Sequence, residues 1–334
     1  MKFYNIDMHI SIIHDIKNIF TDLGHQVDSV CLSGHTWVNN EPKGSTEIIN
    51  VNNWFNINQD LCDAFYNKYK DELKGYDAFV HSYPPAFALL FERWNKPIIT
   101  ILCTRFEYPC ANRLSWLIDG LNRLYKNGLL IPISNNLFDK AYCEKYTNFK
   151  WEHISSLCNY MGVEWVYDKK NKIKTWNKSN LNINHEMIDN NFNIRNKYDR
   201  DKVITTSMGV IHIPYNISIM SAFEHYYCNI PLFVPSEKFL KSTPKNKYNL
   251  LSELYFPEHP LIIDPKWISL SDWYDDNNMP YTIKFDSVEQ LYSLIDSTNY
   301  LEVSERMKDY NIIRKDRTYK QLAEIINKVT ERKL

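Results

Sequence analysis

The first half of the chain alternates short apolar runs with stretches in which apolar residues recur every three or four positions. A short apolar run predicts a buried strand, and the wider spacing predicts an amphipathic helix. Strands that alternate with helices of about 10–15 residues are typical of a parallel, doubly wound sheet. The strands are expected in KFYNID, QVDSVCLS, EIINVN, DAFVHSYPP, KPIITILCTRFEY, LLIPIS and WEHISSL, and the helices at 10–24, 59–73, 86–94, 112–126 and 135–146.

The pattern weakens between residues 159 and 184, where the sequence is polar and has little periodicity. We therefore place a domain boundary in this stretch, near Gly162. A second α/β run follows, so we expect two doubly wound domains with the ligand site in the cleft between the carboxyl ends of their strands. In this run, strands are expected at 209–213, PLFVP and PLIIDP, helices at 217–228, 287–297, 301–311 and 315–333, and a helix or turn at SLSDWYDD.

Composition and charge narrow the function classes. Lys+Arg total 39 and Asp+Glu total 40, so the net charge is −1, which argues against a nucleic-acid binder with its strong basic excess. The seven cysteines are scattered without a C-x-x-C pair, which predicts buried thiols in a reducing compartment and neither a disulfide framework nor a zinc site. No signal-peptide pattern occurs and no apolar run reaches the roughly 18 residues that span a bilayer. We expect a cytoplasmic protein, and peripheral contact with a membrane surface stays open.

One candidate catalytic residue follows the first predicted strand. His9 stands between that strand and the next helix, where a strand-end side chain faces the ligand crevice. The positive end of the helix favours the neutral imidazole, which is able to act as a base. The alternative is that His9 caps the turn or bonds to a backbone carbonyl. Arg105 and Glu107 follow a later strand and are candidates for contact with an acceptor or a phosphate, or for an ion pair with each other.

A βαβ unit is expected at residues 211–239, IHIPYNISIMSAFEHYYCNIPLFVPSEKF. The chain has only 8 glycines and no glycine-rich phosphate loop, so a phosphate site must use a helix N-terminus and side chains. The amides at 217–219 with the Ser218 and Ser221 hydroxyls suit a diphosphate, and Asn216 tolerates the backbone angles of a missing glycine. Glu224, on the border of the polar face formed by Ser218, Ser221 and His225, is able to accept two hydrogen bonds from a ribose diol. Alternatively, Ser218 is a helix cap and Glu224 pairs with a lysine.

The segment PYNISIMSAFEHYYCNIPLFVPS resembles the C-terminal donor motif of GT-B glycosyltransferases. DMHISIIHDIKNIFTDLGHQV and ISNNLFDKAYCEKY are similar to the first and last βα units of that family's N-terminal domain. The resemblance implies two Rossmann-like domains facing a cleft, at 1–160 and 161–314, and a C-terminal helix at 315–334 that packs back on the first domain. It also implies that a nucleotide-sugar contacts the second domain. The implied donor-binding residues are Tyr215, Asn216, Ile217, Ser218, Ser221 and Glu224, with the diphosphate at Ser218 and the ribose at Glu224.

The sequence departs from the family pattern at several positions. Asn216 stands eight residues before Glu224, where retaining members often carry a sugar-binding glutamate. The glycine-rich loop near the N-terminus is replaced by the region of His9, which suits the base of an inverting member. Stereochemistry therefore stays open. The basic pair that contacts the donor phosphates has only weak candidates: Lys172, Lys174 and Lys178.

The sequence thus predicts a metal-independent glycosyltransferase that moves a sugar from a nucleotide-diphosphate-sugar to a glycan or small-molecule hydroxyl. The acidic WYDDN at 273–277 is interpreted as a solvated turn, so neither a metal nor another cofactor is expected. Three alternatives stay open: a nucleotide-sugar 2-epimerase of the same fold, a non-catalytic sugar- or nucleotide-binding scaffold, and a different α/β enzyme that uses no nucleotide.

Overall fold

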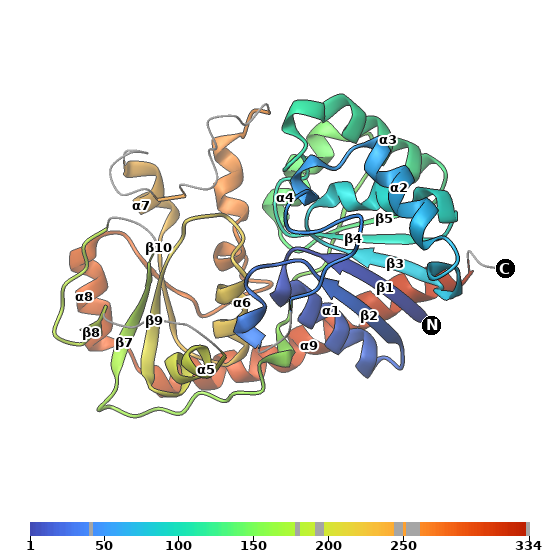
Figure 1. Ribbon diagram of the computed structural model, residues 1–334. Coiled ribbons are helices and arrows are strands. Elements are labelled where there is room, and N and C mark those ends of the chain that lie inside the picture. Colours follow the sequence, from blue (N-terminus) through green and yellow to red (C-terminus); the bar gives the residue numbers. More distant parts are fainter. Residues whose placement is uncertain (40–42, 178–180, 191–196, 244–249, 252–260, 332–334) are drawn as a thin grey trace. The chain divides into compact units, whose positions relative to one another are not determined.

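The computed structural model describes the chain except residues 40–42, 178–180, 191–196, 244–249, 252–260 and 332–334. It divides into two compact units (Figure 1). The first unit contains Met1–Ser156 and Arg317–Leu334, and the second contains Leu157–Asp316. Each unit is built around one parallel sheet, so the predicted α/β class is confirmed.

The sheet of the first unit has six strands in the order β2-β1-β3-β4-β5-β6. All its strand pairs are parallel. In this order the chain runs outward in opposite directions from β1, so the switch point lies between β1 and β3, where open α/β sheets bind ligands. The strands are β1 Lys2–Asp7, β2 Gln26–Cys31, β3 Ala78–His81, β4 Ile98–Leu102, β5 Leu130–Ser134 and β6 Glu152–His153.

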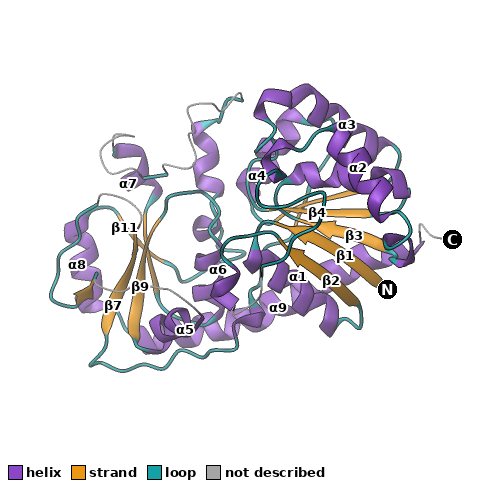
Figure 2. Ribbon diagram, viewed as in Figure 1, coloured by secondary structure: helices purple, strands orange, loops and turns teal. Residues whose placement is uncertain are grey.

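The helices of the first unit cover both faces of its sheet, with α1 on one face and α2 and α3 on the other (Figures 1 and 2). Helix α1 ends as its sequence predicts, because Gly24 has a φ of +83° that suits the residue after a helix C-terminus. The helices are α1 Ile10–Asp22, α2 Gln59–Tyr69, η3 Leu73–Gly75, η4 Pro85–Trp94, α3 Leu114–Lys126 and α4 Leu137–Tyr146.

The sheet of the second unit has five parallel strands in the order β11-β10-β9-β7-β8. Counted along the unit, this is the order of the first five strands of the other sheet, and its switch point lies between β7 and β9. The strands are β7 Lys172–Asn177, β8 Ile188–Asp189, β9 Ser207–Ile213, β10 Leu232–Pro235 and β11 Ile283–Phe285, and the helices α5 Lys197–Thr205, α6 Met220–Tyr227, α7 Glu237–Ser242 and α8 Val288–Ser297.

The C-terminal helix α9, Tyr300–Glu331, is one helix of 32 residues where the sequence predicts two. Its residues up to Asp316 belong to the second unit and those from Arg317 to the first. The predicted break at 312–314 contains two exposed isoleucines, but the polar residues on either side of them are buried and bonded: Asn311 donates to the Tyr226 carbonyl at 2.9 Å, and Arg314 donates to Asn278 Oδ1 at 3.0 Å. These hydrogen bonds let polar residues occupy core positions, so the helix continues.

Two predicted strands are wrong. EIINVN forms turns, because Ile49 N–H bonds to Thr46 Oγ1 at 2.7 Å and Asn50 N–H to Asn53 Oδ1 at 2.9 Å. Such local side-chain bonds compete with a sheet ladder. In PLIIDP, residues 261–264 form no strand, and Asp264 instead caps the following turn by accepting from Lys266 N–H. Pro260 lies outside the described residues.

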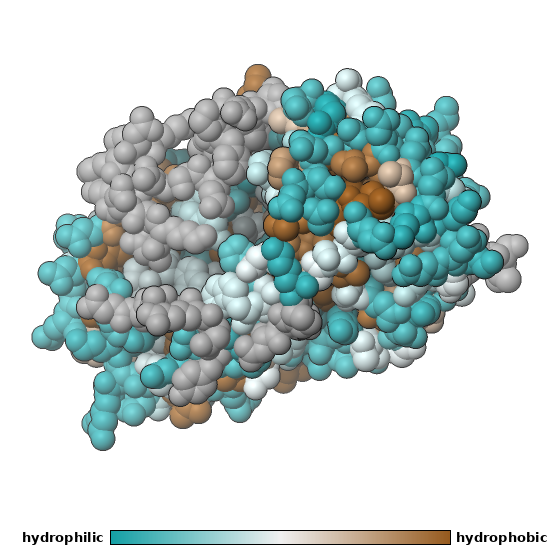
Figure 3. Space-filling view, in the orientation of Figure 1, coloured by the Kyte–Doolittle hydropathy of each residue, from teal (hydrophilic) through white to brown (hydrophobic). Residues whose placement is uncertain are grey.

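All seven cysteines are buried and free, as the sequence predicts. In the part of the chain that the structure describes, every helix is too short or too polar to cross a bilayer. The described surface is mostly hydrophilic in the view of Figure 3, with small hydrophobic areas among the polar ones.

Candidate functional site

The loop between β9 and α6 carries the predicted donor-binding residues, and it differs in detail from the prediction. Helix α6 begins at Met220, not Ile217, with Ile219 as its N-cap. The Ile217 N–H donates to the side chain of its neighbour Asn216 at 2.8 Å, which keeps residue 217 out of the helix. Asn216 does not have a positive φ, so it does not stand in for a glycine; the left-handed residue of this βαβ unit is Asn229, with φ +60°.

The start of α6 keeps polar groups in position for an anion. Its N-cap Ile219 has no side chain that caps the first-turn amides, and the Ala222 amide bonds to the Ile219 carbonyl at 2.9 Å. Ser218 and Ser221 are half-buried beside this turn. The Ser221 hydroxyl is buried and has no hydrogen-bond partner among the described residues. Tyr215 packs against the buried cluster that includes Trp273. This edge of the sheet therefore combines the unsatisfied Ser221 hydroxyl with the N-terminus of α6, a helix of eight residues.

Glu224 lies one turn inside α6 and is 5% exposed. Its Oε1 accepts from the Tyr160 hydroxyl at 2.5 Å and lies 3.8 Å from Arg200 Nη1. The Arg200 side chain, from α5, is itself buried. A buried carboxylate needs such a cation and such donors, because desolvation otherwise opposes its charge. Neither partner is predicted from the sequence.

The predicted polar face of α6 is wrong, because the helix is buried on both sides. His225 is 1% exposed and packs edge-on against Trp176 of β7, with ring centroids 5.1 Å apart. His212, at the end of β9, is fully buried, and neither of its ring nitrogens has a hydrogen-bond partner among the described residues. Burial lowers the pKa of His212 to about 4 and that of His225 to about 3, so both are neutral at pH 7.

In the first unit, the switch point is organised by Asp7 at the end of β1. Asp7 is fully buried and its Oδ1 accepts from the His9 and Tyr83 amides at 2.9 and 3.2 Å. Its Oδ2 accepts from the Ser82 hydroxyl at 2.7 Å and from the Ser82 amide at 2.5 Å. Burial raises the pKa of Asp7 to about 6, although these hydrogen bonds oppose the rise. One carboxylate therefore ties the loops after β1 and β3 together.

His9 lies at this switch point as the N-cap of α1. Its side chain makes no capping hydrogen bond, and its buried Nδ1 has no partner among the described residues. Burial lowers the pKa of the imidazole to about 4, and the charge of nearby His35 adds to the fall. The ring is therefore neutral at pH 7, which is the form that a general base requires.

Arg105 and Glu107 lie together with residues of α4 at the carboxyl ends of β4 and β5. Both are 2% exposed. Arg105 Nη1 lies 3.7 Å from Asp139 Oδ1, and Glu107 Oε1 accepts from the Tyr142 hydroxyl at 2.7 Å. Burial raises the pKa of Asp139; the Arg105 charge opposes this rise and the Glu107 charge adds to it. The three charged groups thus form one buried cluster, which is not predicted from the sequence.

Two of the remaining charged candidates, Lys174 and Asp276, have partners outside α6. Lys174 pairs with Asp189 of the neighbouring strand, and Lys178 lies outside the described residues. In WYDDN, Asp276 pairs with Lys284, as expected for a surface turn. Among the described residues, no three His, Cys, Asp or Glu side chains come together as a metal site would need.

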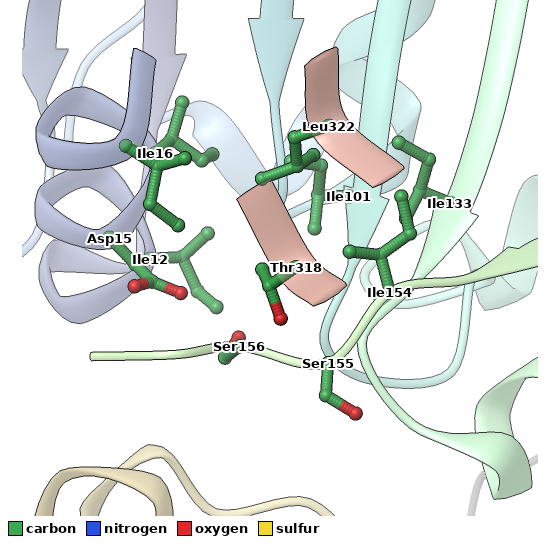
Figure 4. Close-up of a pocket in the computed structure, with 11 residues that line it drawn as sticks. Ile12, Asp15, Ile16, Ile101, Ile133, Ile154, Ser155, Ser156, Thr318 and Leu322 are labelled. Carbon is green, nitrogen blue, oxygen red and sulfur yellow. The ribbon is translucent and has the colours of Figure 1, made fainter. Parts of the chain in front are cut away.

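A small cavity lies inside the first unit, between α1, α9 and the sheet (Figure 4). Isoleucines line most of it, and Asp15, Ser155, Ser156 and Thr318 border one end. Its volume is about 20 Å³. That is room for a single water molecule, so this cavity holds no nucleotide or sugar.

No protein-family model matches the sequence, and no curated protein matches it. Solved structures do match it over nearly their whole length. The glycotransferase of kitacinnamycin matches with a TM-score of 0.51 and 10% identity over 98% of each chain. The spinosyn forosaminyltransferase SpnP matches with a TM-score of 0.50 and 9% identity over 99% of each chain. HepE of Anabaena, solved with UDP and glucose, matches with a TM-score of 0.51 and 9% identity over 98% of this chain and 99% of its own. Such identities show the fold alone, and the chain has the GT-B fold of these glycosyltransferases.

Proposed function

We propose that this protein is a glycosyltransferase that moves a sugar from a nucleotide-diphosphate-sugar to a hydroxyl of a glycan or small molecule, without a metal. The observation that carries the proposal is the buried glutamate Glu224, one turn inside a helix that starts uncapped beside the switch point of the second sheet. That edge is where an α/β sheet of this order binds its ligand. The fold supports the proposal, as does the UDP and glucose in the HepE structure.

In the proposed complex, the donor diphosphate lies at the start of α6. Tyr215, Asn216 and Ile217 form the loop beneath it, the Ser218 and Ser221 hydroxyls donate to it, and the first-turn amides add the partial positive charge of the helix. These groups stabilise the negative charge that develops on the leaving nucleoside diphosphate.

Glu224 accepts the ribose hydroxyls, and Arg200 acts as a positioning residue whose charge orients the carboxylate. The Tyr160 hydroxyl now occupies Glu224 Oε1. In the proposed complex, the ribose shares or takes over this oxygen from Tyr160.

The acceptor hydroxyl lies against His9 in the first unit. His9 removes its proton as the acceptor oxygen forms a bond to the anomeric carbon of the donor sugar. The bond between that carbon and the diphosphate oxygen breaks, and the nucleoside diphosphate leaves with the electron pair. A single displacement of this kind inverts the anomeric centre. Inversion also agrees with Asn216, whose side chain is turned onto the Ile217 amide and is not a carboxylate.

The test begins with binding. The full chain is titrated with UDP, TDP, GDP, ADP and CMP by thermal shift and calorimetry, and we expect one nucleoside diphosphate to stabilise it. Glu224→Ala and Glu224→Gln should weaken that nucleotide about tenfold or more, since each removes a charged hydrogen-bond acceptor. The matched control is Glu107→Ala in the first unit. Glu107 is also a buried glutamate, and it also accepts a hydrogen bond from a tyrosine, Tyr142. Stabilisation by none of the five nucleotides contradicts the proposal, and equal weakening by Glu107→Ala contradicts the ribose assignment.

Catalysis is tested separately with the nucleotide-sugar that binds. We expect His9→Gln to lower kcat by about 10²–10⁴, the usual contribution of a general base, with unchanged nucleotide affinity. Proton NMR of the product gives its anomeric configuration. Retention, or full turnover by His9→Gln, contradicts the role of His9.

A nucleotide-sugar 2-epimerase of the same fold is the second candidate, favoured by the buried cluster of Arg105, Glu107 and Asp139. Carboxylates at a strand edge suit proton transfer at a sugar carbon. The same NMR experiment without acceptor decides: conversion of the donor to its epimer supports the epimerase, and an unchanged donor that reacts only with acceptor supports the transferase.

A further inference from the structure

Three aromatic side chains meet at the carboxyl edge of the first unit's sheet, beside the switch point. Tyr83 follows β3, Tyr108 follows β4, and Trp54 comes from the long segment between β2 and α2. The Tyr83 and Tyr108 rings are stacked, with centroids 5.8 Å apart and planes 11° apart. The Trp54 ring lies 5.7 and 6.2 Å from them, tilted by 53° and 48°. We call these three rings the aromatic corner.

The aromatic corner is partly open to solvent. Tyr108 is 42% exposed, and Phe55, which packs edge-on against Trp54, is 43% exposed. Trp54 and Tyr83 are half-buried. Aromatic residues normally bury most of their large apolar area, so several partly open rings in one place indicate a contact surface for a ligand.

Backbone hydrogen bonds connect the loop of Tyr83 to the loop of the proposed base, His9. The Tyr83 and His9 amides donate to the same oxygen, Oδ1 of Asp7, at 3.2 and 2.9 Å. In addition, the Met8 amide donates to the Tyr83 carbonyl at 2.9 Å. The loops that carry Tyr83 and His9 are therefore joined through one carboxylate, so we expect a ligand on the corner to lie near the residue that is proposed to take a proton.

We propose that the aromatic corner is the acceptor subsite and that its ligand is a sugar ring, so that the acceptor is a neutral glycan; this inference rests on the proposed transferase function. A pyranose has one face of C–H groups, which packs on the electron-rich face of an aromatic ring, and a rim of hydroxyls. The stacked tyrosines supply such an aromatic face, which we call the floor of the corner. Their phenol groups supply polar atoms at the edge of this floor. Trp54, tilted by about 50° from the floor, supplies a wall.

The same tilt argues against a flat aromatic acceptor. A planar ligand binds best in a slot between two parallel faces, and the wall and floor here are not parallel. A sugar ring is thicker and carries hydroxyls around its whole edge. It fits a corner that leaves one side open for the hydroxyl that reacts.

The test titrates the full chain with the disaccharides cellobiose and maltose, and with p-nitrophenol as a planar aromatic probe, by saturation-transfer NMR and tryptophan fluorescence. We expect a disaccharide to bind, and Trp54→Ala and Tyr108→Ala each to weaken it about tenfold, the usual effect of one stacked ring. Tyr108→Phe keeps the ring and should bind within about twofold of the parent protein.

The matched control is Tyr125→Ala. Tyr125 is 41% exposed and stacked on Phe149 at 4.5 Å, but it lies at the end of α3, just before β5 begins, and so at the opposite edge of the sheet. Equal disaccharide affinity of the Tyr108→Ala variant, a loss in Tyr125→Ala as large as that in Tyr108→Ala, binding of p-nitrophenol alone, or no binding by either disaccharide overturns the inference.

UDP is titrated in parallel to separate two failures. If a nucleotide binds and no disaccharide does, the acceptor inference fails alone. If a disaccharide binds at the corner and no nucleotide binds, the transferase proposal fails, and the corner stands as a saccharide site without an acceptor role.

Discussion

The two units have sheets of the same strand order, yet each holds a buried carboxylate at its candidate site in a different way. In the first unit, Asp7 accepts four hydrogen bonds from the amides and hydroxyl of neighbouring loops. In the second, Glu224 is held by a phenol from Tyr160 and by the charge of Arg200. One carboxylate is surrounded by dipoles, and the other is paired with a cation.

This difference has consequences for the chemistry of each unit. The hydrogen bonds to Asp7 do not outweigh the effect of burial on its pKa. The pKa of Asp7 therefore rises to about 6, close to the range in which protons are exchanged at neutral pH. A neighbouring cation, in contrast, offsets part of the desolvation cost of a buried carboxylate and orients it. The unit with Asp7 and neutral His9 therefore suits proton transfer, and the unit with Glu224 and Arg200 suits the binding of a polar donor.

The largest expected effect comes from removing the cation of the Arg200–Glu224 pair. Arg200→Leu leaves Glu224 buried without its cation, and losing one partner of a buried ion pair costs about 3–5 kcal/mol. We expect the free energy of unfolding, measured by urea denaturation of the full chain at pH 7.5, to fall by this amount. The double variant Arg200→Leu/Glu224→Leu removes both charges and should recover most of the loss.

The matched control is a surface pair in the other unit. Arg93 and Asp63 lie 3.4 Å apart with side chains about half exposed, so Arg93→Leu should cost less than about 1 kcal/mol. If the double variant were no more stable than Arg200→Leu, the charge of Arg200 would not be what stabilises buried Glu224. The proposed difference between Asp7, held by hydrogen bonds, and Glu224, paired with a cation, would then be wrong.

The sequence predicts the first unit well because local pattern is sufficient there. Strand β1 and helix α1 follow directly from apolar periodicity and a terminal Gly24. In the second unit, β7 has the same length as β1 but carries two lysines, so its sequence is read as part of a polar stretch. Pairing with β8 and β9 makes it a strand, and such pairing leaves little local trace.

The candidate site shows the same limit. Its elements were predictable, but its contacts join residues far apart along the chain. Tyr160 reaches Glu224 across 64 positions, and Ser82 reaches Asp7 across 75. Arg200 stands in a polar helix whose sequence gives no sign that one arginine is buried. Periodicity fixes which element a residue belongs to, whereas its partners come from tertiary packing.

The second prediction concerns Asp7, the carboxylate held by hydrogen bonds, and follows the free energy of unfolding as a function of pH. Burial raises the pKa of Asp7 from 3.8 to about 6, so between these values the folded protein binds more protons than the unfolded chain. The stability contributed by the protonated carboxyl is therefore fully present below pH 3.8 and is lost as the pH rises through about 6. Asp7→Asn has no such titration. We expect the parent protein to lose up to about 3 kcal/mol relative to Asp7→Asn between pH 4 and pH 7, measured by urea denaturation.

Asp28, on the neighbouring strand β2, provides a control of opposite sign. Burial, the largest single cause, raises the pKa of its carboxyl, but hydrogen bonds from Tyr76, Gln26 and Lys2 and the Lys2 charge together outweigh it, so the net pKa is lowered. Its contribution should therefore grow as the pH rises to about 3.8 and change little well above that value, so the parent protein should gain stability relative to Asp28→Asn only at the acid end of the range. The same slope for both variants would contradict the assignment of Asp7 as a buried acid.

The smallest expected effects come from removing one hydroxyl donor to each carboxylate. Ser82→Ala leaves the Ser82 amide on Asp7 Oδ2, and Tyr160→Phe leaves Arg200 beside Glu224. Each should therefore cost only about 1.5–3 kcal/mol, the range for a hydrogen bond to a charged group. Because the Ser82 hydrogen bond lowers the pKa of Asp7, Ser82→Ala should also move the pH-dependent loss of stability above pH 6. Tyr142→Phe, which removes the hydroxyl donor to Glu107, is the control for loss of a buried phenol. If Tyr160→Phe destabilised the chain as much as Arg200→Leu, Glu224 would be held by its phenol, and the two carboxylates would differ less than their partners suggest.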